Sequence, residues 1–207
     1  MLSKPKGQSM KKGDLTRQRI IALAAPLFNR RGFDGCSMHD VMDATGLEKG
    51  GLYRHFASKQ ELAAEAFLYS LDQAIKTRTD GLDHIPGALS KLAWIIRRFV
   101  ETPGPVPGGC PLLNTAVDAD DGNPILRKLA RKAFADWKHR LAVIIAEGIQ
   151  SGEIRRSTSP DQLANTIIAA LEGGLVLSRI HGSREALKDV EASLALLLDS
   201  VAAPVRP

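Results

Sequence analysis

The chain has 207 residues, 44% of them hydrophobic, enough to bury one medium-sized domain or a small domain joined to a larger one. Its net charge is +5, and the excess lies at one end: residues 1–60 carry eleven Lys/Arg and five Asp/Glu (+6), whereas the rest carries seventeen and eighteen (−1). A basic N-terminal part suits phosphate contact, although basic tails also serve solubility, and two cysteines are too few for a disulfide framework.

Residues 1–13 have no apolar period, and we expect a disordered basic arm without the hydrophobic segment of a signal peptide. The first helix is expected over 14–31. Pro26 removes one of its hydrogen bonds and should kink it, but the apolar spacing continues through the proline. Gly32 is expected to end this helix. No apolar run approaches the length needed to span a bilayer, so the sequence predicts a cytoplasmic protein with no membrane partner.

Two short helices separated by a tight turn are predicted between residues 37 and 56. Ser37 and Asp40 have the S-x-x-D form of a helix start. Gly46 can adopt the positive φ that a tight turn needs. The second helix, expected over 48–56, carries basic and aromatic side chains. This arrangement is typical of helix-turn-helix proteins, whose second helix enters the major groove of DNA.

A series of short motifs makes this interpretation more specific. LF (27–28), RGF (31–33), SM (37–38), TGLEKGGLYRHF (45–56) and SKQEL (58–62) follow one another in this order. Through them, residues 16–62 resemble the DNA-binding domain of the TetR (tetracycline-repressor-like) family of transcriptional regulators. The resemblance implies an all-α fold in which a three-helix head joins a larger C-terminal helical bundle through a linking helix. It divides the chain into the basic arm (1–13), a helix-turn-helix domain (14–60) and a ligand-binding and dimerisation domain (61–207).

The predicted contacts with double-stranded operator DNA come from the second helix and from the starts of its neighbours. Lys49 can donate to guanine or to phosphate, and Ser37 can donate to phosphate from the preceding helix. By resemblance, Tyr53 is a phosphate- and groove-contacting tyrosine, and His55 and Lys59 contact the DNA backbone. His55 is alternatively a plain surface histidine.

Three further positions of the second helix have two interpretations. Arg54 either contacts DNA or is simply solvated. Gly50 and Gly51 each cost roughly 1 kcal/mol relative to alanine inside a helix. We interpret Gly50 as allowing close approach of the backbone to DNA, whereas for Gly51 this interpretation and simple tolerance in a short exposed helix stay equally open. The family often has a hydroxyl at the second glycine position, and Gly51 cannot supply one.

Longer amphipathic helices are predicted after the head. A capping box at 58–61 starts the linking helix, expected to end near residue 78. The segment 102–109 contains three prolines and three glycines and is expected to be a loop. Asn123-Pro124 and Ser159-Pro160 each have the form of a helix start with proline at the first helical position.

The last two predicted helices are apolar on more than one side and therefore need cover on more than one side. One side can pack within the chain, and a second copy is the expected cover for the other. A two-fold homodimer with a four-helix bundle would also space two DNA-reading heads. A fully buried helix pair within a monomer is the alternative. The predicted interface residues are Leu163, Ile167, Ala170, Gly174, Leu177, Leu187, Val190, Leu194, Leu197 and Val201.

The resemblance also implies a small-molecule pocket in the larger domain. Trp94, Phe99, Phe134 and Trp137 are candidates for its apolar wall, and each is equally suited to plain core. Cys110 is a further candidate because it lies at a probable helix start, where the helix dipole lowers the pKa of a thiol. Such a thiol would suit a sensor of electrophiles or oxidants, and an inert buried cysteine is the alternative.

The sequence therefore predicts a ligand-responsive regulator, a repressor, that binds a palindromic operator as a dimer and is released by a small molecule. The alternative function is a small-molecule-binding or thiol-based sensing module without strong operator selectivity. Paired carboxylates in a site-like context, a Ser/His/Asp arrangement, a phosphate loop and a set of metal ligands are all missing from the sequence. We therefore predict no enzyme activity and no cofactor.

Overall fold

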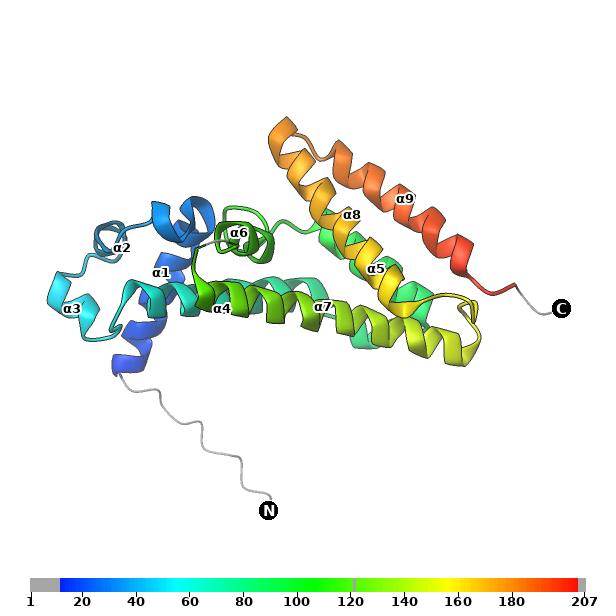
Figure 1. Cartoon of the computed structure of the whole chain (residues 1–207), viewed down its shortest axis with the longest axis horizontal. Coiled ribbons are helices and arrows are strands. Elements are labelled where there is room, and N and C mark those ends of the chain that lie inside the picture. Colours follow the sequence, from blue (N-terminus) through cyan, green and yellow to red (C-terminus); the bar gives the residue numbers. More distant parts are fainter. Residues whose placement is uncertain (1–11, 121, 205–207) are drawn as a thin grey trace, which may run out of the picture.

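The computed structural model describes residues 12–120 and 122–204, and within them the fold is all-α, as predicted (Figure 1). The elements are α1 (Lys12–Gly35), α2 (Met38–Thr45), α3 (Lys49–Tyr53), α4 (Lys59–Thr79), the 3₁₀ turn η1 (Leu82–His84), α5 (Ala88–Glu101), α6 (Pro111–Asp118), α7 (Pro124–Ser151), α8 (Pro160–His181) and α9 (Glu185–Val201). The head, formed by α1–α3 and the first turns of α4, lies at one end of the molecule, and α8 and α9 lie toward the other. The long helices α4 and α7 run between them, so α4 is the predicted linking helix.

Helix α1 is longer than predicted and changes direction at Gly32. The backbone of Gly32 is non-helical (φ 74°, ψ 177°) and ends the first helix, as predicted, although a short helical segment follows it as far as Gly35. Pro26 lies inside α1, and the break is at the glycine instead. A Cβ at position 32 would overlap the carboxylate of Asp118, and the positive φ also disfavours a side chain. Glycine at this position therefore lets α1 bend close beside α6.

Apolar side chains from four helices close the head. Because α2 and α3 are short, each can bury only one stripe, and α1 and the start of α4 supply the remaining walls. The fully buried core of the head consists of Ile20, Ala24, Cys36, Val41, Leu52, Phe56 and Leu62.

The helix starts in the head follow the predicted chemistry, with one difference. Ser58 accepts a hydrogen bond from the backbone N–H of Glu61 (3.1 Å) at the start of α4. The carboxylate of Glu61 accepts from the backbone N–H of Ala57 (2.8 Å) rather than from that of Ser58. Arg17 of α1 donates to Glu61 (2.7 Å) and also pairs with Glu65, so charged pairs hold α1 against α4.

The larger domain packs α5, α7, α8 and α9 around a second apolar core. The loop over 102–110 is non-helical, as predicted. Asn123 caps α7, and Ser159 caps α8, each with proline at the start of the helix. An isolated antiparallel bridge joins Ile154 to Ala202 and ties the end of α9 to the connection between α7 and α8. The core is formed largely by Leu92, Ile96, Leu141, Ile145, Ile167, Leu171, Leu187 and Leu194.

The residues predicted for the dimer interface divide between the interior and the surface of the chain. Gly174 faces Val190 of α9, where a Cβ would lie 2.8 Å from the valine Cγ2, so its small size serves the packing of α8 on α9 within one chain. Five of the ten are buried in this way, and the prediction that they face a partner is wrong: Leu163, Ile167, Gly174, Leu187 and Leu194. Four others are half-buried: Ala170, Val190, Leu197 and Val201.

A different apolar face of α8 and α9 is exposed. Leu177, the remaining predicted residue, is 49% exposed, and beside it on α8 Ile180 is 74% exposed. Val176 on α8 and Leu196 on α9 are also exposed. We call these four residues the α8–α9 apolar face. Periodicity alone did not distinguish it from the buried face, because both helices are apolar on two sides.

Helix α8 requires a correction to the expectation about membranes. Its 22 residues include a stretch with a mean hydropathy of 1.4, long and apolar enough to cross a bilayer by length and composition. No other helix among the described residues meets that test. However, 39% of the stretch is buried inside this fold, and core helices of soluble proteins meet the same test, so it is weak grounds for a membrane segment.

Candidate nucleic-acid interface and ligand chamber

Helix α3 presents its polar side chains outward from an apolar anchor. Leu52 is fully buried in the head, whereas Lys49, Gly50, Tyr53 and Arg54 are all exposed, Tyr53 at 43%. The helix is shorter than predicted, because Glu48 is its N-cap and Arg54 its C-cap. One short helix therefore gathers four of the seven predicted DNA-binding residues on the outer surface of the head.

Gly46 makes the turn that sets α3 against α2. It has φ 68° and donates its N–H to the carbonyl of Met42 (2.8 Å), which completes the end of α2 as predicted. Thr45, just before it, is buried and donates its hydroxyl to the carbonyl of Val41 (2.7 Å). The turn is thus fixed by internal hydrogen bonds before any ligand is present.

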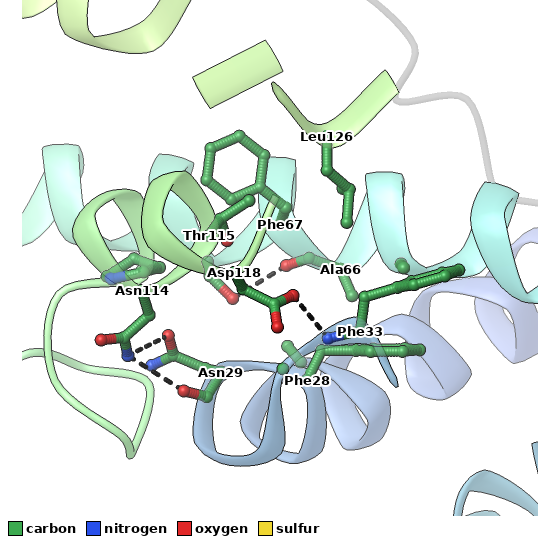
Figure 2. Close-up of a pocket in the computed structure, with 14 residues that line it drawn as sticks. Phe28, Asn29, Phe33, Ala66, Phe67, Asn114, Thr115, Asp118 and Leu126 are labelled. Carbon is green, nitrogen blue, oxygen red and sulfur yellow. Dashed lines mark hydrogen bonds between the residues drawn. The ribbon is translucent and has the colours of Figure 1, made fainter. Parts of the chain in front are cut away.

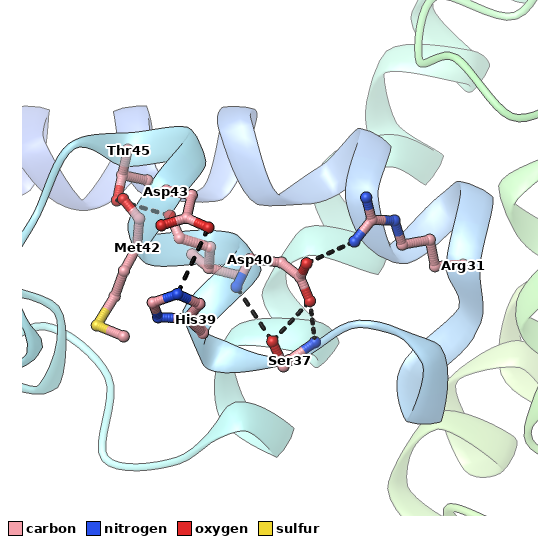
Figure 3. Close-up of polar contacts among 8 residues, drawn as sticks. Arg31, Ser37, His39, Asp40, Met42, Asp43 and Thr45 are labelled. Carbon is pink, nitrogen blue, oxygen red and sulfur yellow. Dashed lines mark hydrogen bonds and ion pairs between the residues drawn. The ribbon is translucent and has the colours of Figure 1, made fainter.

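Ser37, Asp40 and Arg31 form a polar cluster at the start of α2 (Figure 3). Asp40 accepts from the Ser37 N–H (2.7 Å), from the Ser37 hydroxyl (2.6 Å) and from Arg31 (2.6 Å), while its own N–H donates to the Ser37 hydroxyl oxygen (3.1 Å). The hydrogen bonds from Ser37, and then the one from Arg31, lower the pKa of Asp40 from 3.8 to about 2. Both Ser37 donors are therefore used inside the head, so donation of its hydroxyl to phosphate requires the bond to Asp40 to be exchanged.

The two remaining DNA-binding candidates lie beyond α3. His55 and Lys59 are both half-buried. The ammonium of Lys59 lies 4.2 Å from the centre of the Phe33 ring, so a cation–π contact orients it at the start of α4. Both positions stay predictions for contact with the DNA backbone.

A chamber opens in the larger domain between α4, α5, α7 and the start of α6. Its cavity volume is about 100 Å³, smaller than a typical drug-sized site, and part of it is open to solvent. Phe99, Cys110 and Trp137 line it. The rings of Phe99 and Trp137 stack with centroids 6.0 Å apart and form an aromatic wall. We call this space the α4–α7 chamber.

Two predicted pocket residues lie elsewhere. Trp94 lies outside the chamber lining, near the guanidinium of Arg98 (5.4 Å to the ring), and Phe134 packs in the core behind Trp137. Their assignment to the pocket is not supported by this geometry. Sequence reasoning also missed Arg78, which does line the chamber. Its place could have been predicted from helical spacing, because one face of α4 contains Leu71, Ala74, Ile75 and Arg78, all of which line the chamber.

Cys110 is buried and unreactive in character. Its thiol donates to the carboxylate of Glu172 at 2.9 Å, and only 3% of the residue is exposed. Burial, and then the charge of Glu172, raise the pKa of Cys110 from 9.0 to about 12. The prediction that the helix start lowers this pKa is wrong, because desolvation and a nearby carboxylate outweigh the dipole of a short helix. An electrophile-sensing role loses its physical basis.

Helix α6 connects the larger domain to the head. Figure 2 shows Asn29 and Phe33 of α1 facing Asn114 and Asp118 of α6 across a small pocket. Asn114 donates to the carbonyl (2.9 Å) and the side-chain oxygen (3.0 Å) of Asn29, and Asp118 accepts from the Phe33 N–H (2.7 Å). We call these contacts the α1–α6 junction. The N-terminal end of α6 borders the chamber instead, where Pro111 and Leu112 are part of the lining.

A helix-turn-helix head with an exposed α3, joined to a helical domain that contains a chamber, defines a class of DNA-binding transcriptional regulators. Comparison with known proteins identifies the family. Residues 20–66 match the model of bacterial regulatory proteins of the tetR family, and residues 88–194 match that of the tetracyclin repressor-like C-terminal domain. The chain belongs to the TetR family, whose members are transcriptional regulators rather than enzymes.

Relatives and solved structures agree with this assignment. The chain is 27% identical over 175 residues to the HTH-type transcriptional repressor DhaR of Mycobacterium sp. (strain GP1), covering 83% of this chain and 86% of that protein. A TetR-family regulator from Chloroflexus aurantiacus J-10-FL has a TM-score of 0.89 and 39% identity, covering 94% of this chain and 99% of the other. The regulator CifR, as a cysteine mutant bound to 26-base-pair operator DNA, has a TM-score of 0.72 and 26% identity, covering 93% and 98%.

Proposed function

We propose that this protein is a cytoplasmic transcriptional repressor that binds a palindromic operator as a homodimer and leaves it when a small molecule occupies the α4–α7 chamber. The observation that carries the proposal is the surface of α3, where Lys49, Tyr53 and Arg54 are exposed around the buried anchor Leu52. Lysine and arginine can donate to base edges and phosphates in the major groove.

Electrostatics and composition support DNA as the partner of the head. The net charge of +6 over residues 1–60 attracts the phosphate backbone, and the near-neutral remainder does not compete for it. Asp40, an acidic residue on α2, is already paired with Arg31 and hydrogen-bonded by Ser37. It therefore contributes little repulsion toward phosphate.

The α8–α9 apolar face supports a homodimer. Ile180 is 74% exposed and Leu196 is 72% exposed, although both are large and apolar. Large exposed apolar residues on two neighbouring helices favour an interface, and a two-fold axis at this face would pair two copies through a four-helix bundle. Such a dimer holds two heads at a fixed spacing, as a palindromic operator requires.

DNA selection tests the operator half of the proposal. Fragments of the source genome that bind the purified full chain are isolated and sequenced, and their affinity is measured against random duplex over a range of salt. We expect an inverted repeat among the selected fragments and an affinity for it at least about a thousandfold above random DNA. Equal affinity for selected and random duplexes would contradict the proposal.

A pair of charge substitutions tests the dimer. Ile180→Asp puts a charge on the α8–α9 apolar face, and Val117→Asp makes the same kind of change at a valine of α6 that is 71% exposed. We expect the first variant to be monomeric in sedimentation and to lose operator affinity, and the second to stay dimeric. A natural chain that is monomeric at micromolar concentration, or an Ile180→Asp variant that stays dimeric, argues against this interface.

A further inference from the structure

The α4–α7 chamber has an unbalanced charge. Two arginines, Arg78 and Arg140, are among its sixteen lining residues, and no aspartate or glutamate is. Nearly all the other lining residues are apolar or aromatic. Arg140, on α7, is exposed, whereas Arg78, on α4, is half-buried against the aromatic wall.

Arg78 is held in the chamber without a counter-ion. Its guanidinium carbon lies 4.0 Å from the centre of the Phe99 ring, so the ring orients it. Its Nε is buried and has no hydrogen-bond partner, and no ion pair joins Arg78 to any residue over 12–120 or 122–204. A partly desolvated cation normally has an anion or several acceptors around it. The positive charge of Arg78 is therefore not balanced by an anion among the described residues.

Glu172 is the carboxylate to consider as that partner, because the charge of Arg78 acts on it. It accepts the hydrogen bond from Cys110 at 2.9 Å, and its second oxygen is buried without a partner. Burial raises the pKa of Glu172, against smaller opposite effects of the bond from Cys110 and of the charge of Arg78. Because burial disfavours the charged form of Glu172 and no ion pair joins it to Arg78, it does not complete the site.

We propose that the effector of the α4–α7 chamber is an apolar carboxylic acid, whose carboxylate pairs with Arg78 and whose body lies against Phe99 and Trp137. A planar guanidinium stacked on a ring presents its outer N–H groups for a bidentate pair with a carboxylate. The stacked rings suit a flat or branched apolar body, and Arg140 adds positive charge on the exposed side. This inference rests on the proposed function in treating the chamber as the effector site.

A matched series of probes tests the charge preference on the natural full-length chain. The probes are 4-phenylbutanoate, 4-phenylbutanamide and 4-phenylbutylamine, which share one apolar body and differ in charge. Binding is followed by calorimetry and by fluorescence of a Trp94→Phe variant, in which Trp137 of the chamber is the one tryptophan left. We expect the acid to bind saturably at millimolar concentration or below, at least about tenfold more tightly than the amide, with the amine weakest.

Two arginine variants assign that preference to the chamber. Arg78→Gln removes the charge, and Arg98→Gln is the control, since Arg98 also faces an aromatic ring and has a buried unpaired Nε but lies outside the chamber lining. We expect Arg78→Gln to weaken the acid at least about tenfold and to leave the amide unchanged. Thermal unfolding of each variant checks that it is folded.

The outcomes separate this inference from the proposed function. If the acid does not bind the natural chain at millimolar concentration, if the amide or amine binds as tightly as the acid, or if folded Arg78→Gln binds the acid like the natural chain, the inference is overturned. Selective operator binding in such a protein would leave the proposed function standing. Conversely, an acid that binds through Arg78 without releasing operator DNA would support the carboxylate preference of the chamber and contradict release of the operator by its occupation.

Discussion

Replacing Gly50 by alanine should stabilise the head and weaken its binding to DNA. Gly50 is the second residue of α3, has no positive φ, and a Cβ built on it meets no atom within 4 Å. Nothing inside the chain therefore requires glycine there. Alanine should raise the free energy of unfolding by about 0.5–1 kcal/mol through its helix propensity. For a chain of this size, that corresponds to a rise in Tm of about 1–4 °C.

The same substitution should lower the affinity for operator DNA. If the backbone at Gly50 lies against the groove, an added methyl group separates the two surfaces, and we expect at least tenfold weaker operator binding, or about 1.4 kcal/mol. Fluorescence anisotropy on a selected operator fragment measures the affinity, and differential scanning calorimetry measures Tm. A stability gain alone would show that Gly50 is merely tolerated.

Gly51 provides a matched control one residue further along α3. It is half-buried, and its Cβ would lie 3.7 Å from Leu47 Cδ2, an ordinary contact directed into the head. Gly51→Ala should give a similar rise in Tm with operator affinity unchanged within about twofold. The reasoning is refuted if the two variants bind the operator equally well, because close approach at Gly50 would then have no consequence.

Three other predictions follow from local contacts. Asp40→Asn should lower Tm at pH 7. Because the pKa of Asp40 is lowered from 3.8 to about 2, its stabilisation is present above pH 3.8 and is lost as pH falls through about 2, so a difference in Tm that is as large at pH 2 as at pH 7 would contradict the pairing. Because its pKa is raised from 9.0 to about 12, Cys110 should have about 1000-fold less thiolate at pH 8 than an ordinary cysteine. Mass spectrometry should therefore show that iodoacetamide alkylates Cys110 about 1000-fold more slowly in the native chain than in the denatured chain, and similar rates would contradict the raised pKa. Gly148→Ala should lower the free energy of unfolding by about 1–3 kcal/mol, because the new Cβ would lie 2.6 Å from the Cβ of Ala88. An unchanged Tm in calorimetry would show that this site is not overpacked by alanine.

The helix starts were predicted well because the residues that cap each helix lie next to it in the sequence. Ser37 with Asp40, Asn123 with Pro124, and the hydroxyl of Ser159 act within three residues of themselves, so no distant contact can override them easily. The short helical segment between Gly32 and Gly35 was not predicted, for the opposite reason. The conformation of Gly32 is set beside Asp118, which lies 86 residues further along the chain and is brought there only by the packing of α6 on α1.

The DNA-binding surface could be predicted because it depends on which side chains of one short helix are exposed. The chamber could not be predicted because it depends on how distant helices pack. The residues of α3 face outward simply because Leu52 is the apolar anchor of a short helix. The chamber could not be predicted without the fold, because apolar character marks Phe99 and Phe134 alike and does not show which ring borders a cavity. The pKa of Cys110 likewise depends on Glu172, which comes from a different helix.

If a ligand occupies the α4–α7 chamber as proposed, we expect helix α6 to be the element that carries its effect to the head. Because α6 has only eight residues, we expect a displacement of one end to move the other end as well. Pro111 borders both the chamber and the small pocket of the α1–α6 junction, and Asn114, one turn later, holds Asn29 of α1 by hydrogen bonds of 2.9 and 3.0 Å. These bonds tolerate only a few tenths of an ångström before they weaken. If a ligand body presses on the start of α6, we therefore expect either that the α1–α6 junction breaks or that α1, and with it α3, moves along.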